Sequence, residues 1–196
     1  MRLLAIVARW QSYSEDDPVA NAGYFRLRIT LSQGQAQPDP TLAPTAPLDV
    51  NDDAISDRML LAIEGAPLLG AEQGMARLAA ILERLAATQL DGHVVSAHMR
   101  MAQLALHRDP ALARTHALAA LALAESRDVS SAYRGELYLH GARALQAAGD
   151  ESRAQEVLEA GRAWVLAAAQ QVPVEFRDGF LHRHPVNRDL SGPIRR

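Results

Sequence analysis

The chain has 196 residues, a formal net charge of -3 and no Cys. This length suffices for one domain with a hydrophobic core, and the small net charge gives no reason to expect nucleic acid or an acidic membrane as a partner. The absence of Cys and Lys excludes a thiolate metal site, a cysteine nucleophile, a Schiff base and a phosphate-loop lysine.

The N-terminal third divides into two segments of different composition. Residues 1–32 predict an irregular helix pair, whose second helix begins at Pro18 with Asp17 as its N-cap. Arg9 interrupts an apolar run that is too short to span a bilayer, so we expect a cytoplasmic protein. Residues 33–53 contain four prolines and no hydrophobic period, which indicates a linker or surface loop.

From residue 53 onward the hydrophobic spacing is that of amphipathic helices. Apolar residues recur at intervals of three and four, which places them on one helix face. Asp109 is a natural N-cap for a helix whose first residue is Pro110, and Asp91 with Gly92 predicts a turn. The expected helices before this cap cover 53–66, 70–89 and 94–107.

The most informative stretch is 130–171, which predicts a helix hairpin with a tight turn at 148–150. Small side chains lie on the facing sides of both helices, so the two backbones can approach closely. The first helix presents Tyr138, Gly141, Ala142 and Leu145, and the second presents Ala154, Val157, Leu158, Gly161 and Val165. Pro173 ends the hairpin, and short helices are expected over 174–182 and 185–190.

A repeat of about 40 residues accounts for 54–171. Ala154 follows Ala113 by 41 residues, and both stand early in the second helix of a pair. The hairpin resembles a tetratricopeptide repeat: Gly141 and Ala142 occupy the family's small sites, Gly149 fits its turn, and Gly161 replaces the usual Ala. The units are longer than the family's 34 residues. In this they resemble the C-terminal repeats of bacterial signal-transduction ATPases and transcriptional regulators.

The tail strengthens this resemblance, because Pro185-Val-Asn-Arg-Asp-Leu190 is similar to the segment that closes those repeat arrays. The resemblance implies an all-α fold, a right-handed α-solenoid of antiparallel helix pairs with a C-terminal capping helix. The expected divisions are therefore 1–32, 33–53, 54–171 with the repeats, and 172–196 with the capping helix and tail. No phosphate-binding loop is present, since Gly70–Gly74 lacks the required Lys.

Candidate chemistry is sparse. His182 and His184 stand near Glu175 and Asp178, a set that could hold a metal ion, but neighbouring arginines oppose a cation and favour a solvated tail. No nucleophile motif or carboxylate pair with catalytic spacing occurs. We therefore expect no enzymatic activity, no metal and no cofactor.

The remaining hypothesis is a scaffold that binds a protein or peptide within a bacterial signalling system. In tetratricopeptide arrays the first helix of each pair lines the binding surface. Projection onto this sequence gives the groove residues Glu136, Leu139, Arg143 and Gln146, with His98 one repeat earlier. Leu139 is apolar although it lies off the core face, so we expect it to be exposed in the groove. Alternatively, it packs on the preceding repeat.

Two other interpretations stay open. The chain could be a helical ligand-binding or catalytic domain with a pocket beneath residues 33–53. It could instead be a truncated remnant of a larger regulator that forms a homodimer through its N-terminal edge. Neither nucleic acid nor a membrane is expected as a partner in any of these interpretations.

Overall fold

The computed structural model describes residues 55–127, 129 and 132–192, and every regular element in that part of the chain is a helix. The all-α prediction is thereby confirmed for these residues. The expected helix pair at 1–32, the Pro-rich segment at 33–53 and the N-terminal edge lie outside them. The interpretations that depend on a pocket beneath 33–53 or on that edge therefore stay predictions.

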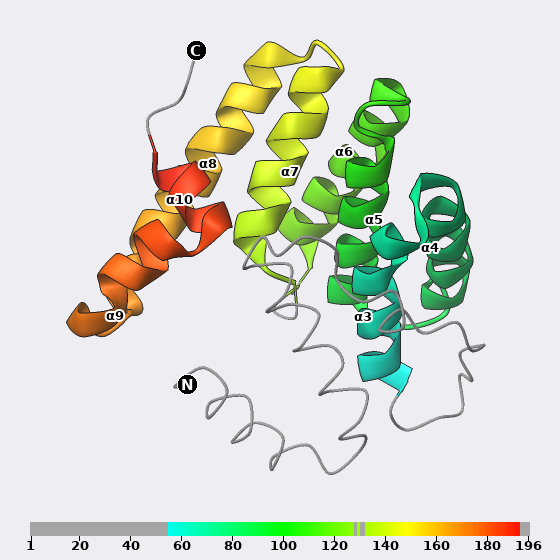
Figure 1. Ribbon diagram of the computed structural model, residues 1–196, viewed down its shortest axis with the longest axis horizontal. Helices are drawn as coiled ribbons and strands as arrows, with labels where there is room; N and C mark the ends of the chain where they lie inside the picture. Colours follow the sequence, from blue (N-terminus) through cyan, green and yellow to red (C-terminus); the bar gives the residue numbers. More distant parts are fainter. Residues whose placement is uncertain (1–54, 128, 130–131, 193–196) are drawn as a thin grey trace.

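From α4 to α8 the helices follow one another through space in chain order (Figure 1). α5 packs against α4 and α6, and α7 packs against α6 and α8. α5 also contacts α3 and α7, so these three helices form a row of their own. The α-helices are α3 (Ile55–Gly65), α4 (Ala71–Leu85), α5 (Asp91–Ala105), α6 (Pro110–Ser126), α7 (Arg134–Ala147), α8 (Glu151–Gln171), α9 (Val174–Asp178) and α10 (Pro185–Ser191). A short 3-10 helix, η2 (Ala66–Leu69), precedes α4, and a π-helical turn, η3 (Gly179–Arg183), precedes α10.

Several boundaries follow from local chemistry. The backbone N–H of Leu112 donates to Asp109 Oδ1 at 2.9 Å, so the predicted cap of α6 is confirmed. At the α7–α8 turn, Gly149 has φ of 80°, a conformation that side chains with a Cβ disfavour. The N–H of Asp150 then donates to the carbonyl of Leu145 at 2.9 Å and closes the end of α7.

The turn expected at Asp91 and Gly92 is wrong, because α5 already begins at Asp91 and Gly92 is buried within it. The connection lies earlier, after α4 ends at Leu85. The Thr88 hydroxyl donates to the carbonyl of Leu85 at 2.8 Å and accepts from the N–H of Leu90 at 3.3 Å. A threonine side chain therefore organises the turn in place of a glycine.

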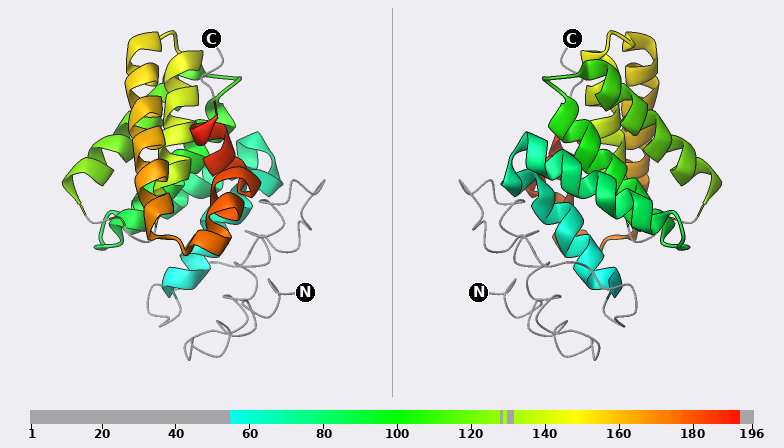
Figure 2. Two further views of the ribbon diagram at one scale, coloured as in Figure 1. Left: turned by 90° about the vertical axis from the view of Figure 1, so that its left-hand side faces the viewer. Right: turned by 90° about the vertical axis from the view of Figure 1, so that its right-hand side faces the viewer.

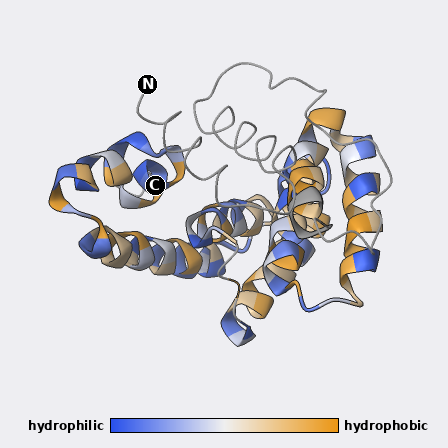
Figure 3. Cartoon of the chain, turned by 90° about the horizontal axis from the view of Figure 1, so that it is seen from below, coloured by the Kyte–Doolittle hydropathy of each residue, from blue (hydrophilic) through white to orange (hydrophobic). Residues whose placement is uncertain are grey.

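Small residues carry much of the packing, as the sequence predicts. Ala113, Ala117 and Ala120 form a fully buried row on α6. In α8, a Cβ at Gly161 would lie only 2.6 Å from the Cβ of Tyr138, so the glycine lets α7 and α8 approach closely at this point. Figure 3 shows hydrophobic and hydrophilic residues alternating around each helix. None of the described helices has the length and apolar character needed to cross a membrane.

After α8 the chain reverses, and α10 packs against both α7 and α8 (Figure 2). Short helices were predicted over 174–182 and 185–190, and α9, η3 and α10 occupy these positions. Leu190 is buried in a cluster with Leu139 of α7 and Val165 of α8. The tail therefore covers apolar surface of the last helix pair.

Candidate functional site

The tail is held in place by a buried asparagine. Asn187, fully buried at the start of α10, accepts a 2.5 Å hydrogen bond from the Tyr133 hydroxyl. Its amide nitrogen donates to the carbonyl of Phe180 at 3.0 Å. Tyr133 also packs edge-on against the rings of Trp164 and His184. Polar and aromatic contacts thus position α10 beside α7 and α8, and this placement creates a concave surface.

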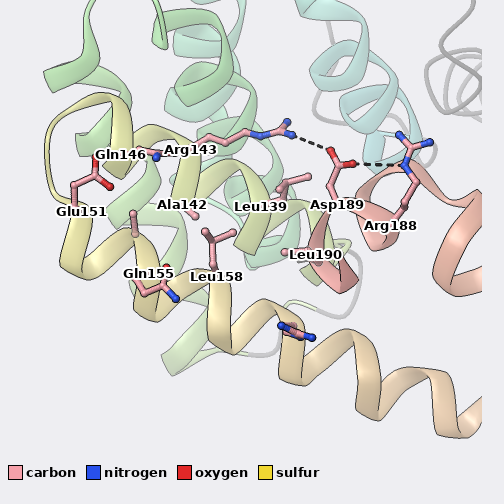
Figure 4. A pocket seen from close by; sticks show the side chains of 13 residues that line it. Leu139, Ala142, Arg143, Gln146, Glu151, Gln155, Leu158, Arg188, Asp189 and Leu190 are labelled. Carbon is pink, nitrogen blue, oxygen red and sulfur yellow. Dashed lines mark hydrogen bonds and ion pairs between the residues drawn. The ribbon is translucent and has the colours of Figure 1, made fainter. Parts of the chain in front are cut away.

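A groove of about 1070 Å³ opens between α7, α8 and α10 (Figure 4). We call it the α7/α8/α10 groove. Its apolar lining includes Leu139 and Ala142 from α7, Leu158 from α8 and Leu190 from α10. Gln146 and Gln155 add neutral hydrogen-bonding groups. Polar and charged residues outnumber apolar ones in the lining, so the groove offers hydrogen bonds and charges beside a limited apolar surface.

The charged lining residues of the groove are three arginines and two carboxylates. Asp189 Oδ2 accepts from Arg143 Nη2 at 2.9 Å, and Asp189 Oδ1 lies 3.6 Å from Arg188 Nε. The exposed Arg143–Asp189 pair connects α7 to α10, whereas the Arg188–Asp189 pair lies within α10. The other two charged residues, Arg162 and Glu151, are exposed and form no ion pair within the described part of the chain. They are therefore available to a ligand.

Three of the five predicted groove residues line this one groove, namely Leu139, Arg143 and Gln146. The expected exposure of Leu139 is wrong, because only 5% of it is exposed beneath α10. Nor does it fit the alternative of packing on the preceding repeat, since its cluster partners lie on α8 and in the tail. Arg143 and Gln146 are exposed at the groove, as predicted.

Glu136 takes part in a different arrangement, a buried ion-pair cluster that joins α3, α5 and α7. Arg100 Nη2 donates to Glu64 Oε2 at 2.5 Å and to Glu136 Oε2 at 2.8 Å. Burial alone would lower the pKa of Arg100, but the two neighbouring carboxylates raise it above its ordinary value. Arg100 is therefore permanently charged, and Glu136 is occupied in holding adjacent helices together.

His98 likewise lies away from the α7/α8/α10 groove. Its Nδ1 is 2.9 Å from Nδ1 of His116 on α6, so one ring donates a hydrogen bond to the other. Burial, with a smaller contribution from the charge of His116, lowers the pKa of His98 to about 4. Burial also lowers the pKa of His116. Both imidazoles are consequently neutral at pH 7 and connect α5 to α6.

Sequence reasoning missed Glu64, Arg100, Asn187 and Arg162. The spacing of 36 residues from Glu64 to Arg100 and again to Glu136 was a detectable signal of neighbouring helix positions. Among the described residues, no three His, Asp or Glu side chains group as a metal-binding set. His184, considered as a metal ligand, instead packs against Tyr133 in the anchor of the tail.

Comparisons with protein-family models, with curated proteins and with solved structures each give no match. The resemblance to tetratricopeptide arrays accordingly stays a prediction, and the geometry of the groove is the basis for a functional hypothesis.

Proposed function

We propose that this chain is a non-enzymatic protein–protein interaction module that binds a peptide segment of its partner in the α7/α8/α10 groove. The observation that carries this proposal is the groove of about 1070 Å³, whose apolar lining is surrounded by exposed charged and amide groups. Apolar contacts supply most of the affinity in such grooves, and the polar groups at the edge select and orient the ligand.

The proposed architecture is a right-handed α-solenoid of antiparallel, tetratricopeptide-like helix pairs with α10 as its cap. The order of helix contacts and the repeated small residues support it. Solenoids of this kind present long concave surfaces to other proteins. From the resemblance of the last hairpin and tail, we further propose a regulatory role in a bacterial signalling system, within the cytoplasm.

The decisive test fills the groove with a large side chain. Gln146 is an exposed lining residue, so Gln146→Trp occupies the groove without disturbing the core. The matched control is Arg153→Trp, at an exposed position of α8 that does not line the groove. The proteins are immobilised on a resin and incubated with an extract of the source cells, and the retained proteins are identified by mass spectrometry. Wild type and control should retain the same partner proteins.

The Gln146→Trp variant should lose those partners while its circular dichroism spectrum remains that of the wild type. Retention of the same partners by all three proteins would show that binding occurs elsewhere on the molecule. Loss of the partners in both variants would likewise count against the groove, because the control places its tryptophan outside it.

A further inference from the structure

The α8 side of the α7/α8/α10 groove carries opposite charges at its two ends. Glu151 is the first residue of α8, and Arg162 lies on the same helix face about three turns later. Between them, Ala154 and Leu158 face the groove and carry no charge. At 1.5 Å per residue, the two charged positions are separated by about 16 Å along the helix axis.

The end marked by Arg162 is reinforced by α10. A Cβ at the neighbouring Gly161 would lie 3.0 Å from Leu190 Cδ2, so α10 lies directly beside this part of α8. Arg188 and Arg143 both approach Asp189 there. Arg143 and Arg188 thus share the single carboxylate of Asp189, and Arg162 adds a positive charge that is unpaired among the described residues, which leaves this end positive. At the other end, Glu151 lies with the neutral Gln146 and Gln155 (Figure 4).

The separation of the charges fits a short extended peptide. An extended chain advances about 3.3 Å per residue, so about five to seven residues connect the two ends. Alternate side chains of such a segment point to the same side, so aliphatic residues in its middle can contact the half-buried Leu158 and the small exposed parts of Leu139 and Leu190. The terminal charges of the segment then meet charges of opposite sign on the protein.

From this complementarity we propose that the α7/α8/α10 groove binds an extended peptide segment with an acidic side chain at one end, aliphatic side chains in the middle and a basic side chain at the other end. The acidic side chain pairs with Arg162, and the basic side chain pairs with Glu151. This inference rests on the proposed function, because it specifies the chemistry of the segment that the groove accepts.

The test uses fluorescence anisotropy with labelled seven-residue peptides. The first probe is Asp-Ala-Leu-Ala-Leu-Ala-Lys with an amidated C-terminus. The others carry Asp at both ends, Lys at both ends, or Ser in place of both Leu. The wild-type chain should bind the acid–base probe most tightly. Replacement of Leu by Ser should remove most of the binding, because the apolar contacts are lost.

Reversing one charge should switch the preference. Glu151→Arg makes both ends of the groove positive, so this variant should prefer the peptide with Asp at both ends by about fivefold over the acid–base probe. The matched control is Glu156→Arg, which makes the same charge change at an exposed position of α8 outside the groove. The control should keep the preference of the wild type.

The inference is overturned if the folded wild type binds all four peptides equally or binds none of them. It is also overturned if Glu151→Arg leaves the order of affinities unchanged, or if Glu156→Arg changes it in the same way. These outcomes are distinct from failure of the proposed function. If Gln146→Trp removes the cellular partners while the peptides show no charge preference, the groove binds proteins but selects them by other chemistry.

Discussion

The hydroxyl of Tyr133 donates a 2.5 Å hydrogen bond to Asn187, which lies 54 residues later in the chain. The first residue immediately precedes α7, and the second belongs to α10. Because Asn187 is fully buried, this bond and the bond to the carbonyl of Phe180 satisfy an amide group that water cannot reach. This bond holds in place the helix that forms one wall of the α7/α8/α10 groove.

We predict that Asn187→Ala destabilises the chain by about 1–3 kcal/mol, because it leaves two partly buried polar partners without their hydrogen bonds. Tyr133→Phe removes only one of these bonds and should cost less. Urea unfolding of the two single variants and the double variant measures their coupling. A double variant whose loss equals the sum of the single losses would show that the two side chains do not act together.

The buried cluster around Arg100 gives a second prediction. Arg100→Met leaves the side chains of Glu64 and Glu136 close together without their shared cation, so we expect a loss of about 3–5 kcal/mol. The control is Arg114→Met, whose 3.2 Å pair with Asp150 is half-exposed and should contribute less than about 1 kcal/mol. Chemical denaturation measures both losses of unfolding free energy. Equal losses for Arg100→Met and Arg114→Met would show that burial does not strengthen the ion pairs of Arg100.

Features with local causes could be predicted from the sequence. Asp109 caps α6 through an atom only three residues away, and Gly149 is required by the conformation of a single turn. The buried alanine row of α6 follows from helical periodicity alone. In each of these features the residues that determine the structure lie within one or a few helical turns of each other.

The groove itself could be predicted only in part. The sequence identifies Arg143 and Gln146 through the tetratricopeptide resemblance, which implies that non-core positions of the first helix of a pair line a binding surface. The burial of Leu139 depends on Val165 and Leu190, and hence on where α10 docks after two reversals of the chain. The ion pair between Glu136 and Arg100 depends similarly on the packing of α5 against α7. Periodicity within one helix contains no information about such contacts.

The paired histidines predict a loss of stability in acid. The pKa of His98 is about 4 in the folded chain and about 6.5 when unfolded, so the unfolded chain binds more protons between these values. Stability should therefore fall as pH decreases from about 6.5 towards 4. Solvent screening of the partly exposed rings reduces the effect to about 1 kcal/mol between pH 7 and pH 5.

Thermal unfolding at several pH values measures this dependence. His98→Gln should flatten the curve between pH 7 and pH 5, because it removes the group with the lowered pKa. Replacement of the exposed His107 by Gln should leave the curve unchanged and serves as the control. Equal flattening by both substitutions would contradict a specific contribution from the His98–His116 pair.

The last prediction concerns Gly161, where the sequence departs from the tetratricopeptide pattern. Gly161→Ala would introduce the residue that is usual in the family, and alanine favours a helix over glycine by about 1 kcal/mol. Here, however, the new Cβ would lie 2.6 Å from the Cβ of Tyr138 and 3.0 Å from Leu190 Cδ2. We expect overpacking to outweigh the helical preference and to give a net loss of about 1–2 kcal/mol of unfolding free energy.

The control is Gly179→Ala. A Cβ there meets nothing within 4 Å, so this substitution should be neutral or stabilising. Denaturation midpoints of the two variants compare these effects directly, and a stabilised Gly161→Ala would show that α7 and α8 can separate without cost at this point.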